Sequence, residues 1–351
     1  MFDLSSPKVA RGQALRYNPG MSWTVQGHDW AVKMLQQHIA AGAIRHAYLF
    51  AGSPSIGRRT LALQFAQAIN CAQPPEPGVP CGECRTCRQI GGMQQPDLTV
   101  VQSERAGGSL KVEQVRDLQH TLSLSPYESR YRVALLLRFE EATTSAQNAL
   151  LKTLEEAPER AILLLTADSP ENLLPTIVSR CEILRMRPLK LGQVGEILQA
   201  RGLEAAEATR LAHLSGGKLG YALQLAQEPS LQEAQEEWIE ALLDLLNANL
   251  RERFAYAGRF RGAERDQVHR ILQTWLLFWR DVFLTRIKAR VPLFFLRWQE
   301  KTTALAGKLE VEAIQAQIFA LEKALQRLET TNVNTQMLLE VLLVDWPRIR
   351  V

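Results

Sequence analysis

The sequence lacks long uncharged apolar runs. Its longest apolar stretches, such as Val133–Leu137 and Ala161–Thr166, are far shorter than the about 18 residues that a membrane-spanning helix needs. The first residues, Met1–Lys8, also lack the uninterrupted apolar core of a signal peptide. We therefore expect a cytoplasmic protein with no membrane partner.

The sequence also lacks a strong excess of either charge. It has 41 Lys and Arg against 37 Asp and Glu, a net charge of +4, which is too small to indicate nucleic-acid binding by itself. Glycine and proline number 21 and 16, and 46% of the 351 residues are hydrophobic. This composition is that of a globular chain, and the length predicts two or three domains of roughly 150 residues.

Residues 27–188 alternate short β-rich runs with helical patterns, which predicts an α/β domain with a largely parallel sheet. Helices are expected at about 60–68 and 145–156, the second ending before Pro158. The near-continuous hydrophobicity of the expected strands suits strands that are covered on both faces. The expected strands are 47–50, 98–101, 132–137 and 162–166.

Beyond about residue 188 the strand signals stop, and the chain predicts helices only. We expect domains at 1–188, 189–229 and 230–351, the last two helical. In the third, five apolar residues follow one helical face. This stripe favours an internal core face over packing against a partner helix. Its residues are Ile314, Ile318, Leu321, Leu325 and Leu328. The expected helix breaks are Gly202, Gly216-Gly217, Pro229, Gly262 and Pro292.

The segment Gly52–Thr60 has the position and outline of a phosphate-binding loop. A working loop needs a Lys after its second Gly and then a Ser or Thr hydroxyl for Mg²⁺. Arg58 and Arg59 occupy these places, and a register shift that recovers Thr60 takes Gly57 away from the basic residue. We expect a degenerate loop in which nucleotide binding is doubtful; the alternative is a helix N-terminus that never bound nucleotide. Its candidate binding residues are Gly52, Gly57, Arg58, Arg59 and Thr60.

The acids that would complete such a site are also displaced. A strand ending in adjacent acids would hold Mg²⁺ and activate water, but the strand at 133–137 ends in Arg138. Glu140 and Glu141 come too late unless the strand extends by two or three residues. Both parts of a hydrolytic site are therefore impaired.

Four cysteines lie close together in the sequence with the spacing C-x9-C-x2-C-x2-C. Four thiolates can enclose a tetrahedral Zn²⁺ and leave no position for water, so this pattern predicts a structural zinc site. Disulfides are the main alternative, disfavoured in the cytoplasm, and an iron–sulfur cluster is a lesser one. Cys181 is expected to be a buried apolar residue. The candidate zinc ligands are Cys71, Cys81, Cys84 and Cys87.

An ordered series of motifs resembles the bacterial DNA polymerase III clamp-loader AAA+ subunits and, within that family, its delta-prime branch. Most of the matching motifs lie in residues 27–189, and the resemblance is weaker from there to about residue 229. In the C-terminal part it rests mainly on helical character and on Asn332-Val333-Asn334. The motifs are Gly27-His28-Asp29, His46–Phe50, Gly52–Thr60, the cysteine cluster, Asn148–Glu156 and Ser179-Arg180-Cys181.

The resemblance implies an AAA+ P-loop-type parallel-sheet domain with a zinc module inserted at 71–87, a small helical lid and a C-terminal helical collar domain. In the family's ATPase subunits the strand-end acids fall on Leu137 and Arg138, and a nucleotide-sensing Arg falls on Gly220. None of these residues matches, so the resemblance implies a stator subunit that does not hydrolyse ATP.

The resemblance assigns a role to Arg180, the arginine of the Ser-Arg-Cys motif. In the family this residue acts in trans on ATP held by the neighbouring subunit. An arginine finger stabilises charge on the transferred phosphoryl group and contributes roughly 10³ to 10⁵ in rate. Without the resemblance, an interface salt bridge or a helix cap would explain Arg180 equally well.

The resemblance further implies a component of the DNA polymerase III holoenzyme, with gamma/tau and delta subunits, the sliding clamp and primer-template DNA as partners. Zn²⁺ is the expected structural ion, and ATP and Mg²⁺ are expected only in neighbouring subunits. Two other functions stay open. One is an active ATPase that uses Arg58 and Thr60 with Glu140 or Glu141. The other is a zinc-dependent nucleic-acid-binding protein on a decayed AAA+ scaffold.

Overall fold

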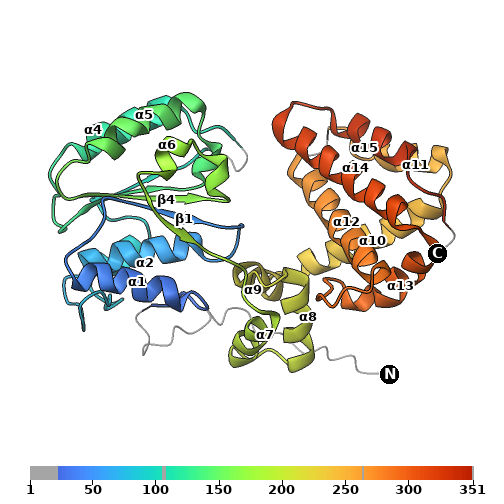
Figure 1. Cartoon of the computed structure of the whole chain (residues 1–351), viewed down its shortest axis with the longest axis horizontal. Helices are drawn as coiled ribbons and strands as arrows, with labels where there is room; N and C mark the ends of the chain where they lie inside the picture. Colours follow the sequence, from blue (N-terminus) through green and yellow to red (C-terminus); the bar gives the residue numbers. More distant parts are fainter. Residues whose placement is uncertain (1–22, 105–107, 263–264, 350–351) are drawn as a thin grey trace, which may run out of the picture. The chain divides into compact units, whose positions relative to one another are not determined.

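A computed structural model describes residues 23–104, 108–262 and 265–349, which form two compact units (Figure 1). The first contains the described residues up to Arg187 together with Ala200–Gly202, and the second contains the remainder. Among the described residues, no helix has both the length and the apolar character to cross a bilayer. The expected division into domains at 1–188, 189–229 and 230–351 stays a prediction.

Within the described residues, the strands of the first unit form one five-stranded parallel sheet in the order β2-β3-β4-β1-β5. Every residue of the three central strands is buried, as their continuous hydrophobicity predicts. The strands are β1 (Ala47–Ala51), β2 (Leu98–Val101), β3 (Arg132–Leu136), β4 (Ala161–Ala167) and β5 (Glu182–Arg185).

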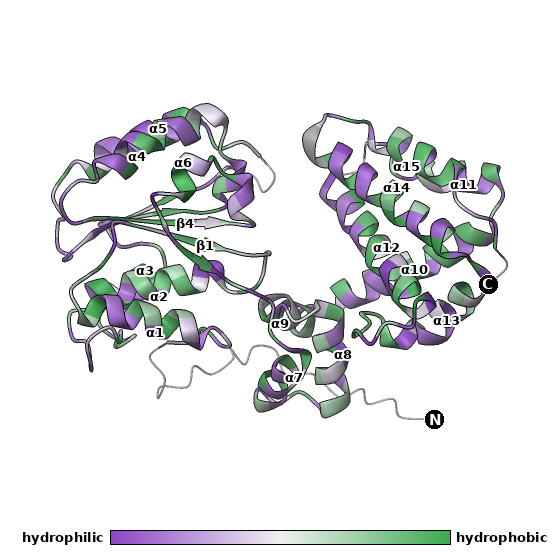
Figure 2. Ribbon diagram, in the orientation of Figure 1, coloured by the Kyte–Doolittle hydropathy of each residue, from purple (hydrophilic) through white to green (hydrophobic). Residues whose placement is uncertain are grey.

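Helices cover both faces of this sheet (Figure 1). Alternate residues of β1 enter different cores: Tyr48 and Phe50 pack with α1 and α2, whereas Leu49 packs with α4 and α5. Figure 2 shows the resulting apolar strands between two amphipathic helical layers. The helices are α1 (Asp29–Ala40), α2 (Arg58–Asn70), α3 (Arg85–Gly91), α4 (Val112–Leu122), α5 (Thr144–Glu155) and α6 (Pro175–Val178), with 3₁₀ turns η1 (Phe139–Glu141) and η2 (Pro170–Asn172).

The four expected strands and two expected helices of this unit are confirmed to within about two residues. β5 was not predicted. It is a four-residue strand with charged residues, Glu182 and Arg185, at its ends, and it lies at the edge of the sheet beside β1. Such a sequence lacks the continuous apolar run of a central strand.

The second unit is helical, as expected. One apolar core joins its first three helices and a larger one joins the others. The predicted stripe is confirmed as an internal face, since Ile314 and Leu321 are fully buried in the larger core. The helices are α7 (Leu191–Ala200), α8 (Ala205–Ser215), α9 (Leu219–Gln227), α10 (Pro229–Asn247), α11 (Leu250–Gly258), α12 (Arg265–Arg286), α13 (Gln299–Lys308), α14 (Val311–Thr330) and α15 (Thr335–Val344), with η3 at Leu296–Trp298.

A buried arginine fastens the chain after α15 to the rest of this unit. Arg253 on α11 is 1% exposed and donates to the backbone carbonyls of Leu245, Leu343, Trp346 and Pro347. Its planar guanidinium has enough donors for all four acceptors, which a lysine would not have. The end of α10 and the segment after α15 are thus held by one side chain.

Candidate nucleotide-site remnant and metal centre

The segment that resembles a phosphate-binding loop lies at the carboxyl edge of the sheet. It connects β1 to α2, and β1 pairs with β4, which pairs with β3. In a parallel sheet the carboxyl ends of neighbouring strands meet at one edge, so the residues that follow β1, β4 and β3 come together there. The expected position of the loop is therefore confirmed.

Two glycines give this loop its backbone conformation. Gly57 caps α2 with a φ of 104° in the left-handed region, and no side chain caps this helix. Gly52 has a φ of 148°, and a Cβ there would lie 2.4 Å from the carbonyl oxygen of Met186. A side chain at Gly52 would clash, so the loop requires glycine at this point.

Arg58 points to the inside of the domain. Its side chain is 9% exposed, and its Nη1 lies 2.7 Å from Oδ1 of Asp168, the first residue after β4. Arg58 occupies the place where a working loop has the phosphate-binding lysine. In this chain the positive charge at that place is therefore neutralised by a carboxylate of the same domain.

Glu140, in η1 after β3, is the third charged group of this cluster. Burial, and after it the negative charge of Asp168, raise the pKa of Glu140 to about 7, although the positive charge of Arg58 opposes this shift. Near neutral pH the cluster of Arg58, Asp168 and Glu140 therefore has a net charge between zero and −1.

The end of β3 has an ion pair where ATPase subunits have acids. The strand β3 ends at Leu136 and does not extend by the two or three residues that would place Glu140 or Glu141 at its end. Both glutamates lie instead in the 3₁₀ turn η1. Arg138 has a φ of 49°, and its Nε donates to Glu141 Oε1 at 2.9 Å. Glu141 also accepts from the Ser103 hydroxyl.

The other candidate loop residues lie outside this cluster. Arg59 and Thr60 are exposed on the first turn of α2. Gly220 is exposed near the start of α9, in the second unit. Only Arg58 among the basic residues of the loop is directed inward.

Arg180 lies in the turn between α6 and β5, with a side chain 34% exposed. Its Nη2 lies 2.7 Å from Glu155 Oε1 at the end of α5, and its Nη1 donates to the carbonyl of Thr176 at 2.9 Å. The structure thus brings together the two motifs at 148–156 and 179–181. Within this chain Arg180 makes an ion pair and a helix-end contact.

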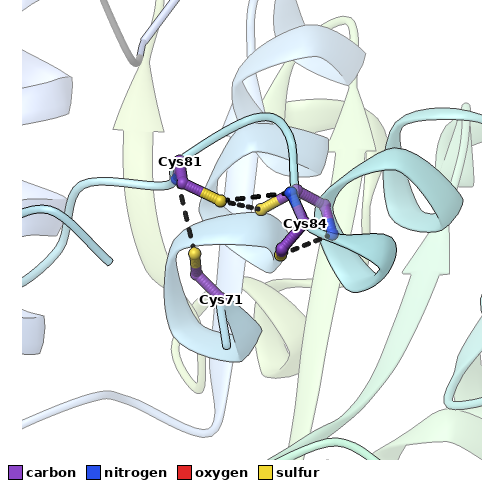
Figure 3. Close-up of side chains that lie close together, drawn as sticks. Cys71, Cys81 and Cys84 are labelled. Carbon is purple, nitrogen blue, oxygen red and sulfur yellow. Dashed lines mark hydrogen bonds between the residues drawn. The ribbon is translucent and has the colours of Figure 1, made fainter. Parts of the chain in front are cut away.

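The four clustered cysteines converge between the end of α2 and the start of α3. All four Sγ atoms lie within 4.8 Å of one another. Figure 3 shows the side chains of Cys71, Cys81 and Cys84 turned toward one another. Zn–S bonds of about 2.3 Å in a tetrahedron place the sulfurs about 3.8 Å apart, so the observed spacing fits one Zn²⁺.

Backbone N–H groups already surround these sulfurs. The N–H groups of Cys81, Cys84 and Cys87 donate to the sulfurs of Cys71, Cys81 and Cys84 respectively, at 3.3 to 3.4 Å. Although burial opposes it, donors from Cys87 and Ala72 lower the pKa of Cys84 to about 7. Donors of this kind stabilise thiolates, which are the form that binds a metal.

All five cysteines are free thiols, so the disulfide alternative is not what the structure has. Cys181 packs against the apolar core beneath α4 and α5, and burial raises the pKa of its thiol to about 12. Cys181 is only partly buried, less than expected, and it lies outside the cluster of four cysteines, as its sequence position predicts.

Known proteins resemble this chain over most of its length. A family model described as DNA polymerase III, delta subunit, matches residues 27–190. DNA polymerase III subunit delta' of Pseudomonas aeruginosa is 32% identical over 91% of this chain and 97% of its own length. The chain belongs to the DNA polymerase III subunit delta' family. Subunit delta' of Bacillus subtilis is 29% identical over 89% of this chain and 94% of its own length.

Other similarities of this delta' family member are more distant. Subunit tau of Escherichia coli is 33% identical, but over 53% of this chain and 28% of tau. A solved structure of a DNA polymerase III gamma subunit-related protein from Thermotoga maritima is 16% identical and covers 90% of this chain and 97% of its own, with a TM-score of 0.48.

The sequence analysis did not identify the ion-pair partners of Arg58 and Arg180, which are Asp168 and Glu155. Asp168 directly follows a buried strand at the same sheet edge as the phosphate loop, and that position could have indicated it. Glu155 has no such signal, because its pairing with Arg180 depends on how α5 packs beside α6.

Proposed function

We propose that this chain is a non-hydrolysing stator subunit of the DNA polymerase III clamp loader and that Arg180 acts in trans on ATP bound by a neighbouring subunit. It would help to place the sliding clamp on primed DNA in the cytoplasm. Membership in the delta' family supports the clamp-loader role.

The observation that carries the non-hydrolysing role is the ion pair of Arg58 with Asp168. ATP hydrolysis needs a cation on the β and γ phosphates and an acid that holds Mg²⁺. Here Asp168 neutralises the loop cation, and Arg138 stands at the end of β3 in place of an acid. The loop cation at Arg58 and the end of β3 at Arg138 therefore offer no free group for either task.

The partial exposure of the Arg180 side chain supports its proposed role as a trans arginine finger. An ion pair between side chains that are 34% and 52% exposed contributes at most about 1 kcal/mol, so Arg180 can exchange Glu155 for a phosphate of another subunit. A guanidinium supplied in trans stabilises charge on the transferred phosphoryl group. The proposed partners are the gamma/tau and delta subunits, the sliding clamp and primer-template DNA.

The four cysteines would hold a structural Zn²⁺, which supplies a tetrahedral cross-link and no catalytic group. The cross-link would fix the 71–87 segment against the ends of α2 and α3, because its ligands come from both. A zinc site of this kind contributes to folding of the module around it.

The test is DNA-stimulated ATP hydrolysis by a complex reconstituted from gamma/tau, delta, clamp and this chain. The wild-type chain alone is expected to hydrolyse no ATP. The Arg180→Ala variant is expected to assemble normally and to lower the rate at which the complex hydrolyses ATP. Hydrolysis by the isolated chain that is lost when Glu140 and Glu141 become Gln would establish an active ATPase instead. Specific, steeply salt-dependent DNA binding by the isolated chain would favour the nucleic-acid-binding alternative.

A further inference from the structure

The two apolar cores of the second unit share one long helix, α10. The smaller core joins α7, α8 and α9, and the larger core joins the later helices. The start of α10 packs against the smaller core through Leu231, whereas Ile239, about two turns further along, lies in the larger core. Because a helix can bend, α10 alone would let the two groups of helices move relative to each other.

A second connection between the two groups is the segment between α12 and α13, residues 287–298, which we call the brace. Its inner side is fixed to α12. The fully buried Asp281 accepts from the backbone N–H groups of Phe294 and Phe295 at 2.7 and 2.9 Å. The Arg280 guanidinium lies over the Phe294 ring, 4.8 Å from its centre. These contacts hold the middle of the brace against the C-terminal helices.

The outer side of the brace contacts α8. Nδ1 of His213 donates to the carbonyl oxygen of Leu293 at 2.7 Å. The Phe294 ring lies so close to Gly216, the residue after α8, that a Cβ on this glycine would come within 2.5 Å of it. Between these two contacts, Leu214 packs against both apolar cores. A hydrogen bond, a close aromatic contact and a shared apolar side chain therefore join α8 to the brace.

Charged side chains from α8, α10 and the brace meet at Glu236 on α10. Its carboxylate lies 2.5 Å from Arg297 of the brace and 3.8 Å from Arg210 of α8. The three side chains are between 31 and 67% exposed, so each pair contributes at most about 1 kcal/mol. The buried contacts of Phe294 and His213 therefore supply most of the attachment, and the charges add to it.

We propose that the brace fixes α7, α8 and α9 to the C-terminal helices, so that the two groups move as one rigid body. Two separate attachments, α10 and the brace, restrain the bending that a single helix would permit. The brace thereby excludes a joint near residue 229, although each group of helices has its own core. A displacement of α8 would then be passed on to the C-terminal helices. The inference is independent of the proposed function, since it concerns contacts within this chain and involves no ATP.

The experiment measures distances between two spin labels in the full chain by pulsed electron paramagnetic resonance. The labels are attached to p-acetylphenylalanine at exposed Thr209 on α8 and Gln315 on α14, which leaves the native cysteines unmodified. Wild type is expected to give one narrow distance distribution. The brace variant combines His213→Ala, Phe294→Ala and Arg297→Ala, and it should at least about double the width of this distribution.

A second label pair verifies that the variant keeps its larger core. Asp244 on α10 and Gln315 are both exposed, and their helices share that core, so their distance distribution should be equal in wild type and brace variant. The matched control combines Phe254→Ala with Arg251→Ala, two exposed positions on α11 outside the contacts of the brace, and should keep both distributions narrow.

If the triple variant does not fold, the measurement uses His213→Ala with Arg297→Ala, which leaves the packing of Phe294 in place. A distribution between α8 and α14 that is as narrow in a folded brace variant as in wild type would overturn the inference. A broad or two-peaked distribution in wild type would also overturn it. Failure of the proposed function is a separate result, which would appear as ATP hydrolysis by the isolated wild-type chain.

Discussion

Arg180 Nη2 lies 2.7 Å from Glu155 Oε1, across 25 residues of sequence. The two residues belong to two of the motifs that carry the family resemblance, and the contact joins the end of α5 to the turn before β5. Because both side chains remain partly exposed, the pair positions the guanidinium at the surface without sequestering it.

The first prediction concerns this arginine. Arg180→Ala should slow hydrolysis of the ATP held by the neighbouring subunit by roughly 10³-fold or more, because a trans finger contributes that much to phosphoryl transfer, and should thereby lower ATP turnover of the reconstituted complex. Arg185→Ala is the matched control, since Arg185 is an exposed, ion-paired arginine on the neighbouring strand. The proposed arginine-finger role is refuted if both variants assemble normally and their complexes hydrolyse ATP at the wild-type rate.

The second prediction concerns the metal. Protein purified without added metal should contain about one equivalent of Zn²⁺, measured by mass spectrometry of the metal content, because the four sulfurs fit one tetrahedral ion. Cys84→Ser should lose the ion and melt at a lower temperature. Cys181→Ser should keep it, because Cys181 lies outside the cluster. Wild-type protein with four reactive thiols and neither zinc nor iron would contradict this expectation.

The third prediction is a pH dependence of stability in the second unit. Asp281 is fully buried, and burial raises its pKa to about 6, although its carboxylate accepts from the N–H groups of Phe294 and Phe295 and pairs with Arg280. In the unfolded chain its pKa is 3.8. The folded state therefore binds the proton more tightly, and stability should fall as pH rises from about 4 to about 6.

The size of this effect is on the order of 3 kcal/mol. Urea unfolding at several pH values should show that Asp281→Asn loses this decline, since an amide has no charge to bury. Asp244→Asn, at an exposed position on α10, is the control and should keep the wild-type profile. An unchanged profile in Asp281→Asn would rule out this carboxyl as the cause.

The fourth prediction concerns the buried arginine on α11. Arg253→Met should lower the free energy of unfolding by several kcal/mol, because each buried carbonyl left without a donor costs about 1 kcal/mol or more. Arg253→Lys should rescue only part of the loss, since an ammonium has three donors for four carbonyls. Arg251→Met, exposed on the same helix, should unfold like wild type in denaturant titrations.

Patterns in the sequence predicted those features that depend on local periodicity or spacing. The buried strands are continuous apolar runs, and the cysteine spacing brings four sulfurs together without reference to the rest of the fold. β5 was not predictable in this way because its hydrogen bonds to β1, and not its own composition, make it a strand. The pairing of Arg58 with Asp168 depends on which strands are neighbours, which no local pattern specifies.

The ion pair of Arg58 with Asp168 joins two side chains of one chain, so its formation depends neither on the concentration of a ligand nor on a chemical reaction. A nucleotide in the same place would be exchanged and hydrolysed, and the loop around it would change with each event. If this chain is the proposed non-hydrolysing subunit, the geometry of its phosphate loop is independent of the ratio of ATP to ADP in the cell, because the ion pair needs no ligand. The proposed neighbouring subunits would then change their nucleotide state against a surface of constant shape.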